Sequence, residues 1–361
     1  MTVEVARAAP GFVSELLTPA QLKRLIPCSA ASAATVQQAR KNVRSILQGR
    51  SDRLLVVIGP CSIHDCMAAR HYARRLLRMR EQWGQELEIV MRAYLEKPRT
   101  TLGWTGLLND PFLDGSGLIS HGLEIGRSLL EELNAMGMPV AHEIVAPVTM
   151  GYLDDLLAWA AVGARTSASP VHRQLASGLD MPVGFKNGVE GQVQVAVDAI
   201  LSARHPHSYV AVRPQGTLGV YNSRGNHDAH LVMRGGRQPN YDSASLGAAA
   251  SLLRAAGLPE SLVVDASHGN SQKDHRRQSL VCADLAGQIS GGNRCISGVM
   301  IESNLRAGRQ DLLAGKVPDP ELSITDACVG WDESAEILAL LAEAVRARRS
   351  RSRQAAPEVA C

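Results

Sequence analysis

The chain of 361 residues has few aromatic side chains and a net charge of only +3. It contains three phenylalanines, and no RNA- or DNA-binding motif accompanies its basic residues. Because single-strand nucleic-acid binders depend on aromatic platforms and basic surfaces, this composition argues against that class. No run approaches about 18 uninterrupted apolar residues, and the start "MTVEVARAAPGF" lacks the continuous apolar core of a signal peptide. We therefore expect a cytoplasmic protein with neither a membrane nor a nucleic-acid partner.

Seven cysteines are spread along the chain without a C-x-x-C pair. An odd, dispersed set predicts neither a disulfide scaffold nor a zinc ribbon, and most of these thiols are expected to be reduced. Five arginines crowd residues 346–353 near the end of the chain. We interpret them as the solvated end of a helix, with a nucleic-acid or membrane arm as the alternative.

Short apolar runs alternate with longer amphipathic segments from Leu54 onward, the pattern of repeated βα units and a parallel sheet. Eight runs are predicted to be strands: residues 54–58, 87–92, 140–144, 164–166, 183–186, 209–213, 262–266 and 296–301. Eight such units predict an α/β fold, a (β/α)8 TIM barrel. The alternative, a doubly wound sheet, is weakened because no G-x-G-x-x-G follows a strand.

The chain is predicted to have one catalytic domain with additions. Residues 1–50 form an N-terminal extension, for which we expect a role in oligomerisation or regulation, and they include the helix-start signal "TPAQLKRLI". The barrel covers residues 51–348 and carries an inserted β-hairpin at about 213–236, around the turn-rich "YNSRGNH". Residues 349–361 are expected to be a flexible tail.

Several basic residues stand at the ends of the predicted strands or in the loops that follow them. They are Arg92, Lys97, Arg99, Arg165, Lys186 and Arg234. A barrel places its active site at the carboxyl ends of its strands, so these cations would converge on one mouth. Phosphates or carboxylates are the natural partners, because a guanidinium grips them with two parallel hydrogen bonds.

A second set at the strand ends suggests metal binding. Cys61 follows the first run in "LLVVIGPCSIHD", His268 follows the seventh, and Glu302 directly follows the eighth. A thiolate, an imidazole and carboxylates make a mixed soft and hard donor set suited to a divalent transition metal. For each residue alone, the alternative is a core thiol, a satisfied histidine or a helix cap.

The longer motifs resemble those of one enzyme family. "GPCSIHD", "EKPRTT", "GWTGLLNDP", "GART", "HRQLASGL", "PVGFKNG", "RGGRQPNY", "SHGNSQK" and "SITDACVGW" are similar to the class I 3-deoxy-D-arabino-heptulosonate 7-phosphate (DAHP) synthases, in the family's order, over roughly residues 15–348. The resemblance implies a transferase that condenses phosphoenolpyruvate with erythrose 4-phosphate, the entry step of the shikimate pathway. It also implies a (β/α)8 barrel with an N-terminal extension and an inserted hairpin.

The resemblance assigns roles to individual residues. It implies that the metal ligands are Cys61, His268, Glu302 and Asp326, while manganese, iron, cobalt and zinc all stay open. It implies that phosphoenolpyruvate is held by Arg92, Lys97, Arg165, Lys186 and Arg234, and that Arg99 and Thr100 bind erythrose 4-phosphate. The metal would act as a Lewis acid on the sugar aldehyde. Lys97 is the candidate proton donor to the new alkoxide, and Glu143 the candidate for positioning water.

Some positions differ from the family pattern. "GARTSASP" stands where the family has "GARTTESQ", which introduces Ala168 and Pro170; "GWTGL" places Thr105 where a lysine is usual; and "DASH" places Ala266 where a phenylalanine is usual. These changes leave two alternatives: a specialised or weakly active paralogue on a related sugar phosphate, and a non-catalytic regulator that binds phosphorylated metabolites.

The resemblance also implies regulation and assembly. An aromatic amino acid inhibitor is expected near residues 148–152 and 175–180, with tryptophan favoured. A homodimer or homotetramer is expected.

Overall fold

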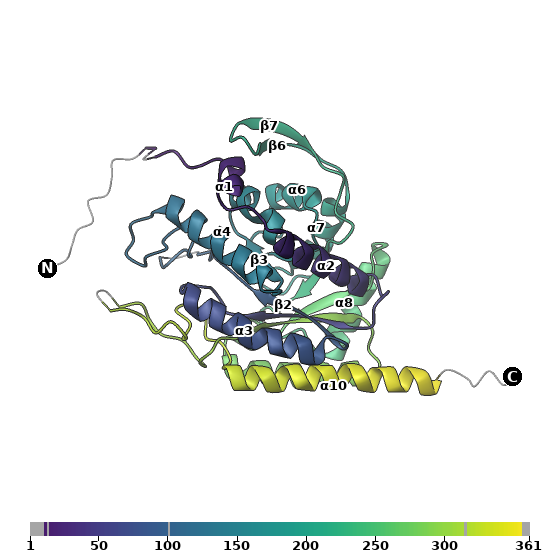
Figure 1. Cartoon of the computed structure of the whole chain (residues 1–361). Coiled ribbons are helices and arrows are strands. Elements are labelled where there is room, and N and C mark those ends of the chain that lie inside the picture. The colour runs from purple at the N-terminus through teal and green to yellow at the C-terminus, as the bar shows by residue number, and fades with distance from the viewer. Residues whose placement is uncertain (1–10, 13, 100–101, 314–315, 356–361) are drawn as a thin grey trace.

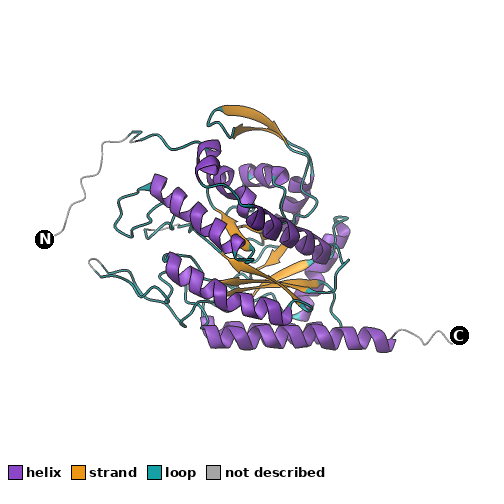
Figure 2. Cartoon of the chain, in the orientation of Figure 1, coloured by secondary structure: helices purple, strands orange, loops and turns teal. Residues whose placement is uncertain are grey.

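Eight parallel strands close into a barrel in the order β1-β10-β9-β8-β5-β4-β3-β2. The computed structural model, shown in Figures 1 and 2, describes residues 11–12, 14–99, 102–313 and 316–355. The barrel strands are β1 (Leu54–Gly59), β2 (Leu87–Arg92), β3 (Val140–Ile144), β4 (Trp159–Val162), β5 (Val183–Lys186), β8 (His230–Met233), β9 (Leu262–Asp265) and β10 (Ile296–Glu302). Every residue of these strands is buried, as expected when helices cover a parallel sheet.

Helices surround the barrel on the outside (Figure 2). The longer ones are α3 (Cys66–Trp83), α4 (Ile119–Ala135), α6 (Pro170–Gly178), α7 (Gln194–Arg204), α8 (Ser243–Ala255), α9 (Gln278–Ser290) and α10 (Trp331–Ala355). The connection from β3 to β4 is made of short helical turns: η1 (Pro147–Thr149), α5 (Met150–Leu153) and η2 (Asp154–Leu156). A further turn, η3 (His275–Arg277), precedes α9. None of the helices in the described ranges is long and apolar enough to cross a membrane.

The N-terminal extension contributes two helices, α1 (Pro19–Leu25) and α2 (Ala30–Leu47). Thr18 caps α1 in a capping box with Gln21, and Pro19 stands in the first turn. Ala39, Val43 and Ile46 of α2 belong to the same core cluster as the residues that fill the barrel interior. Since α2 ends just before β1 begins, this helix closes the amino-terminal end of the barrel.

The structure confirms six of the predicted barrel strands and corrects two. Residues 164–166 are not the fourth strand, which is β4; the alanine-rich "AWAAV" resembled the end of a helix, but it lies fully buried between β3 and β5. Residues 209–213 are not the sixth, which is β8. They fall instead mainly in β6 (Ser208–Val212), whose partly exposed residues pair antiparallel with β7 (Leu218–Asn222).

Two boundaries also need correction. The inserted hairpin spans residues 208–222 rather than about 213–236, because "HLVM" within the predicted range is a barrel strand. The expected tail does not begin at residue 349, because α10 continues to Ala355. Arg349 holds this part of the helix to the start of the barrel through two 2.7 Å hydrogen bonds to the Asp52 carboxylate.

Candidate active site

A cavity of about 370 Å³ opens at the carboxyl ends of the barrel strands. Most of the candidate residues line it: Lys97, Arg99, Glu143, Arg165, Lys186, Arg234, His268, Glu302 and Asp326. Thr100 lies outside the described residues. Arg92 and Cys61 are fully buried and do not appear in the cavity wall. Residues that are far apart in the sequence therefore meet at one mouth of the barrel.

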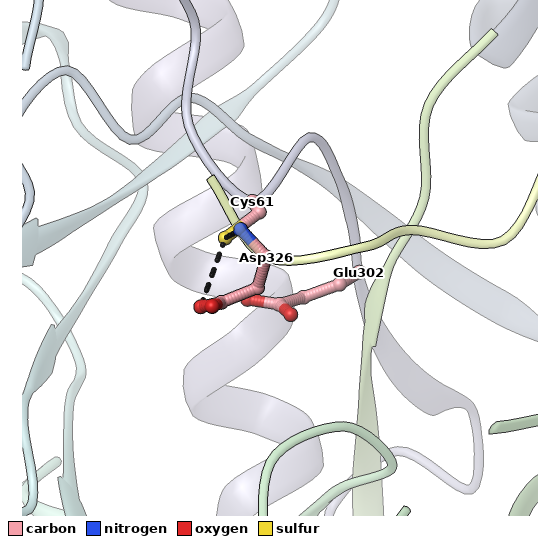
Figure 3. Close-up of side chains that lie close together, drawn as sticks. All are labelled: Cys61, Glu302 and Asp326. Carbon is pink, nitrogen blue, oxygen red and sulfur yellow. Dashed lines mark hydrogen bonds between the residues drawn. The ribbon is translucent and has the colours of Figure 1, made fainter. Parts of the chain in front are cut away.

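Three potential metal ligands meet beside this cavity. Cys61 comes from the loop after β1, Glu302 from the end of β10, and Asp326 from the loop before α10, as Figure 3 shows. One ligand atom from each lies within 4.8 Å of the others, and the Cys61 Sγ donates to Asp326 Oδ2 at 3.4 Å. The fourth candidate is next to them, with His268 Nε2 3.8 Å from Glu302 Oε1. Three clustered sulfur and oxygen donors with an imidazole nitrogen beside one of them make a mixed donor set that fits a transition metal.

The electrostatics of this cluster also fit a cation. Burial, reinforced by the Glu302 carboxylate, raises the pKa of the Cys61 thiol well above its usual value. Burial also acts to raise the pKa of Asp326, but the charges of Lys97 and His268 outweigh it and lower that pKa. A buried thiol beside two carboxylates needs positive charge nearby before it can ionise, and a divalent ion supplies it.

His268 is oriented by Asp265, a residue that sequence reasoning did not single out. Its Nδ1 lies 2.9 Å from Asp265 Oδ2 and 2.7 Å from Ser267 Oγ. These contacts leave Nε2 directed toward Glu302, the arrangement in which a carboxylate holds a metal-binding imidazole. The signal was present in "DASH", where a carboxylate at the strand end precedes the histidine by three residues.

Arg92 lies beneath the cavity instead of lining it. Its Nη2 donates to Glu302 Oε1 at 3.1 Å, and its guanidinium stacks 4.0 Å from the centre of the Tyr94 ring. Gln278 holds the other side of Glu302, accepting from its backbone N–H at 2.9 Å and donating to its carbonyl at 3.0 Å. Glu302 is therefore fixed from two directions. The role of Gln278 depends on a contact between α9 and β10, which the local sequence around either element does not predict.

The cations in the cavity outnumber their carboxylate partners. Lys186 Nζ lies 3.5 Å from Asp265 Oδ2 and 4.0 Å from Glu143 Oε2. Arg165 and Arg234, by contrast, form no ion pair with any residue that the structure describes. Burial lowers the pKa of Arg234, and the charge of Arg165 adds to the effect. This excess of positive charge is suited to an anionic ligand with more than one acidic group.

Two glycines allow loops to approach this site closely. A Cβ on Gly163 would lie 2.4 Å from Glu143 Oε1, so a side chain there would displace the carboxylate. Gly235 has φ +74°, and a Cβ on it would lie 2.5 Å from the Asn270 backbone nitrogen. The loop that carries Arg234 can therefore pack directly on the loop that carries His268.

The three surface positions that depart from the family pattern lie outside the cavity wall. Thr105, Ala168 and Pro170 are exposed, and Pro170 begins α6. Ala266 is buried beneath the "DASH" turn. Further polar residues that were not candidates do line the cavity: Ser271, Lys273, His275, Gln278 and Arg309.

Comparisons with known proteins agree with this geometry. Residues 29–339 match the model of the DAHP synthetase I family. The chain belongs to this family. It is 50% identical to the Phe-sensitive phospho-2-dehydro-3-deoxyheptonate aldolase of Escherichia coli K12, over 93% of the chain and 96% of that protein. It is 49% identical to the Trp-sensitive enzyme of Enterobacter agglomerans, over 93% of the chain and 97% of that protein.

The same family appears among solved structures. The phospho-2-dehydro-3-deoxyheptonate aldolase of Francisella tularensis SCHU S4 superposes with a TM-score of 0.92 at 43% identity. The match covers 94% of this chain and 99% of that one. Both the barrel and its additions are thus shared with this DAHP synthase.

Proposed function

We propose that this protein is a metal-dependent DAHP synthase, a transferase that joins phosphoenolpyruvate to erythrose 4-phosphate and releases phosphate. The observation that carries the proposal is the juxtaposition of two sets of residues at one barrel mouth. Cys61, Glu302 and Asp326 bring ligand atoms within 4.8 Å of one another, and Arg165, Lys186 and Arg234 line the adjacent cavity. A metal centre beside an anion site is what this reaction needs, because both substrates carry phosphate.

The cations divide between the two substrates. Lys97, Arg165, Lys186 and Arg234, which line the cavity, hold the phosphate and carboxylate of phosphoenolpyruvate together with Arg92, which lies buried and bonded to Glu302. Arg99, whose Nε donates to the Trp104 carbonyl at 2.9 Å, presents its exposed guanidinium to the phosphate end of erythrose 4-phosphate. Thr100 is proposed to assist it.

Cys61, His268, Glu302 and Asp326 would hold the divalent metal, for which manganese, iron, cobalt and zinc are the candidates. When bound, such an ion supplies Lewis-acid polarisation of a carbonyl group.

Lys97 is placed to supply a proton during carbon–carbon bond formation. Its Nζ lies 3.5 Å from Asp326 Oδ2. Although burial acts to lower the pKa of Lys97, the neighbouring Cys61, Glu302 and Asp326 side chains raise it above its usual value, so the amine carries its proton. As C3 of phosphoenolpyruvate bonds to the aldehyde carbon, the carbonyl oxygen becomes an alkoxide and takes that proton.

Glu143 is placed to act on the other half of the reaction. Burial acts to raise the pKa of Glu143, but Lys186, Lys97 and Arg92 outweigh it and keep the side chain a carboxylate. A carboxylate facing the cavity can orient the water that adds to C2. The resulting hemiketal phosphate then breaks its carbon–oxygen bond to C2 and expels phosphate.

The proposed reaction is tested by phosphate release from the two substrates, with chelator-treated protein supplied with manganese. Release should require both substrates and the metal. Lys97→Ala should reduce kcat by about a hundredfold or more, and Glu143→Gln should alter the pH–rate profile. If the pH–rate profiles of both variants match that of the parent, the proposed roles of Lys97 and Glu143 are wrong. If folded, metal-loaded protein releases no phosphate, the proposed reaction is wrong.

We also propose that an aromatic amino acid regulates the enzyme from a separate groove. A hollow of about 690 Å³ lies between α1, α5, α6 and the hairpin, lined by residues that include Val148, Leu175, Tyr209 and Tyr221. It coincides with the region predicted from the sequence and offers aromatic and aliphatic walls. Relatives named for phenylalanine and tryptophan are equally similar, at 50% and 49%, so the preference for tryptophan stays a prediction. An unchanged rate with all three aromatic amino acids at millimolar concentration would reject this regulation.

The proposal extends to the oligomeric state of the protein and to its place in the cell. We propose a homodimer or homotetramer that works in the cytoplasm. The free thiols support a reducing compartment: among the described residues, Cys28, Cys61, Cys66, Cys282, Cys295 and Cys328 are unpaired.

A further inference from the structure

A second cavity, of about 670 Å³, lies at the opposite end of the barrel from the proposed active site. It is bounded by the end of α2, by the residues that precede β1, β9 and β10, and by the last turns of α10. Ile46, Leu47 and Ile296, all buried, give it an apolar floor. Pockets for small metabolites typically have volumes of about 300 to 1,000 Å³.

The cavity wall carries more positive than negative charge. Its ionisable residues are Arg53, Arg294, Arg348 and Arg349 against Asp52 and Glu260. Both carboxylates already have partners, since Asp52 accepts two hydrogen bonds from Arg349 and Glu260 accepts two from Arg254, which lies outside the cavity.

Arg53 also has a partner, because its Nη1 lies 2.9 Å from Glu88 Oε2. In the part of the chain that the structure describes, Arg294 and Arg348 are thus left without a carboxylate.

Of these two arginines, Arg348 has the greater need of an anionic partner. Its side chain is buried, with 8% of the residue exposed, and its hydrogen bond among described residues goes to the Asp52 carbonyl at 2.5 Å. A guanidinium has five N–H donors, so most of its capacity is unused. Burial lowers the pKa of Arg348; the nearby Asp52 carboxylate offsets part of this effect, and the charges of Arg294 and Arg349 add to it. An anion in the cavity would satisfy the donors and neutralise the repulsion.

Four hydroxyl groups also line the cavity, those of Ser51, Ser261, Ser297 and Ser352. Ser261 already donates to Ser297 Oγ at 2.7 Å and Ser352 to the Arg348 carbonyl at 3.1 Å, so Ser51 and Ser297 are the hydroxyls left to donate to a ligand. Arg294 Nη2 donates to Ser352 Oγ at 3.0 Å, which places this arginine beside α10 and near Arg348. Two guanidiniums with two further hydroxyls match a phosphoryl group, which offers at least three acceptor oxygens, better than a single carboxylate.

We propose that this cavity binds a small phosphate monoester, with Arg348 and Arg294 holding the phosphoryl group and the apolar floor accepting the carbon skeleton. The bound molecule ties α10 to the segments that precede β1 and β10. Because it binds the folded chain, it raises the melting temperature as its concentration rises. The site is separate from the metal cluster and from the groove beside the hairpin.

Calorimetric titration of the full chain with glycerol 3-phosphate, and in parallel with inorganic phosphate, tests the proposal. The parent should show two sites. Arg348→Gln should weaken one of them by at least about tenfold and leave turnover intact, while Arg165→Gln should weaken the other. Arg294→Gln is an exposed substitution that removes the second guanidinium without risk to the core, and it should weaken the same site as Arg348→Gln.

Arg351→Gln is the matched control, since Arg351 is exposed on the same helix and lies outside the cavity wall. It should bind like the parent. If Arg348→Gln and Arg294→Gln bind glycerol 3-phosphate as tightly as Arg351→Gln does, the proposal is overturned. It is also overturned if this site in the parent binds inorganic phosphate but does not bind glycerol 3-phosphate. If the parent shows only the site that Arg348→Gln weakens, and lacks the site that Arg165→Gln should weaken, then the proposed active site is in question and the proposed phosphate monoester site still stands.

Discussion

At the scale of single residues, the buried thiol of Cys61 is the most specific feature of the site. It lies against two carboxylates, where an unpaired thiolate would be costly and a metal-bound one would not. Cys61→Ser should lower the affinity for manganese by at least about tenfold and lower activity in parallel. Metal titration of chelator-treated protein, followed by the phosphate-release assay, measures both quantities.

Cys282 provides the matched control for this change. It is equally buried, but it packs in α9 within the hydrophobic core, and among the described residues a single carboxylate, Glu333, acts on its thiol where Cys61 has two. Cys282→Ser should therefore cost some stability without changing metal affinity. Equal metal affinities in the Cys61→Ser and Cys282→Ser variants would show that the sulfur of Cys61 is not a ligand.

Asp265 supports a second prediction at this scale. The residue is fully buried between His268 and Lys186, and their charges overcome the effect of burial and hold the pKa of Asp265 well below its usual value. Asp265→Asn should lower metal affinity by about ten- to a hundredfold, because the imidazole loses the group that orients it. Asp242→Asn is the control: Asp242 caps α8 near the surface, and asparagine caps a helix equally well. Unchanged metal affinity in Asp265→Asn would contradict the orienting role.

These residues show how far the site could be predicted from the sequence. Cys61, His268, Glu302 and Lys186 are placed by one rule, that active sites form at the carboxyl ends of barrel strands. Asp326 lies in a loop outside the strands, and only the family resemblance indicated it. The contacts of Gln278 and Arg92 with Glu302 depend on which helix and which strand pack together, so local sequence carried no signal for them.

At the scale of elements, Arg127 attaches the N-terminal extension to the barrel. This fully buried residue of α4 donates to the carbonyls of Ile26 and Tyr152 at 2.7 Å and to both oxygens of Asp155 at 2.8 Å. Asp155→Asn should lower the free energy of unfolding by about 2 kcal/mol at pH 7, since it leaves a buried guanidinium without its counter-charge. Urea denaturation measures this difference.

The pH dependence of this loss has a definite sign. Burial acts to raise the pKa of Asp155, but its hydrogen bonds with Arg127 outweigh that effect and lower the folded-state pKa. The stabilisation is therefore present above the unfolded pKa of about 3.9 and fades as pH falls through the lower folded value. The gap between parent and Asp155→Asn should narrow below about pH 4. Asp154→Asn, which removes a more exposed pair with Lys23, should cost no more than about 1 kcal/mol. A gap that is unchanged in acid would contradict the assignment to this ion pair.

The elements also show why two strand predictions were wrong. "AWAAV" and "HLVM" are short and carry no alternation, so local pattern could not tell a buried strand from a helix end. "SYVAV" has strong β-propensity, but β-propensity does not distinguish a barrel strand from a surface hairpin. The pairing of β8 with β5 and β9 decides the matter, and that pairing is a long-range property.

At the scale of the whole molecule, the hairpin presents an apolar surface that the described residues of the chain leave exposed. Figure 1 shows it standing out beside α1 and α6, on the side away from α10. Val210 is 70% exposed, and Leu218 and Val220 are each 72% exposed. Exposed apolar side chains grouped on one element mark an interaction surface, and a second copy of the chain is the partner expected here.

Charged substitutions on this surface should therefore change the mass of the particle. Val210 and Val220 face each other across the hairpin, so Val210→Glu combined with Val220→Glu places two like charges on the contact. Sedimentation should give a dimer or tetramer for the parent and a smaller species for the double variant. Leu280→Glu is the control, because this residue is similarly exposed at 66% but lies on α9, away from the hairpin. If the parent sediments as a monomer, or if both variants keep the parent's mass, then the hairpin is not the surface through which the chains associate.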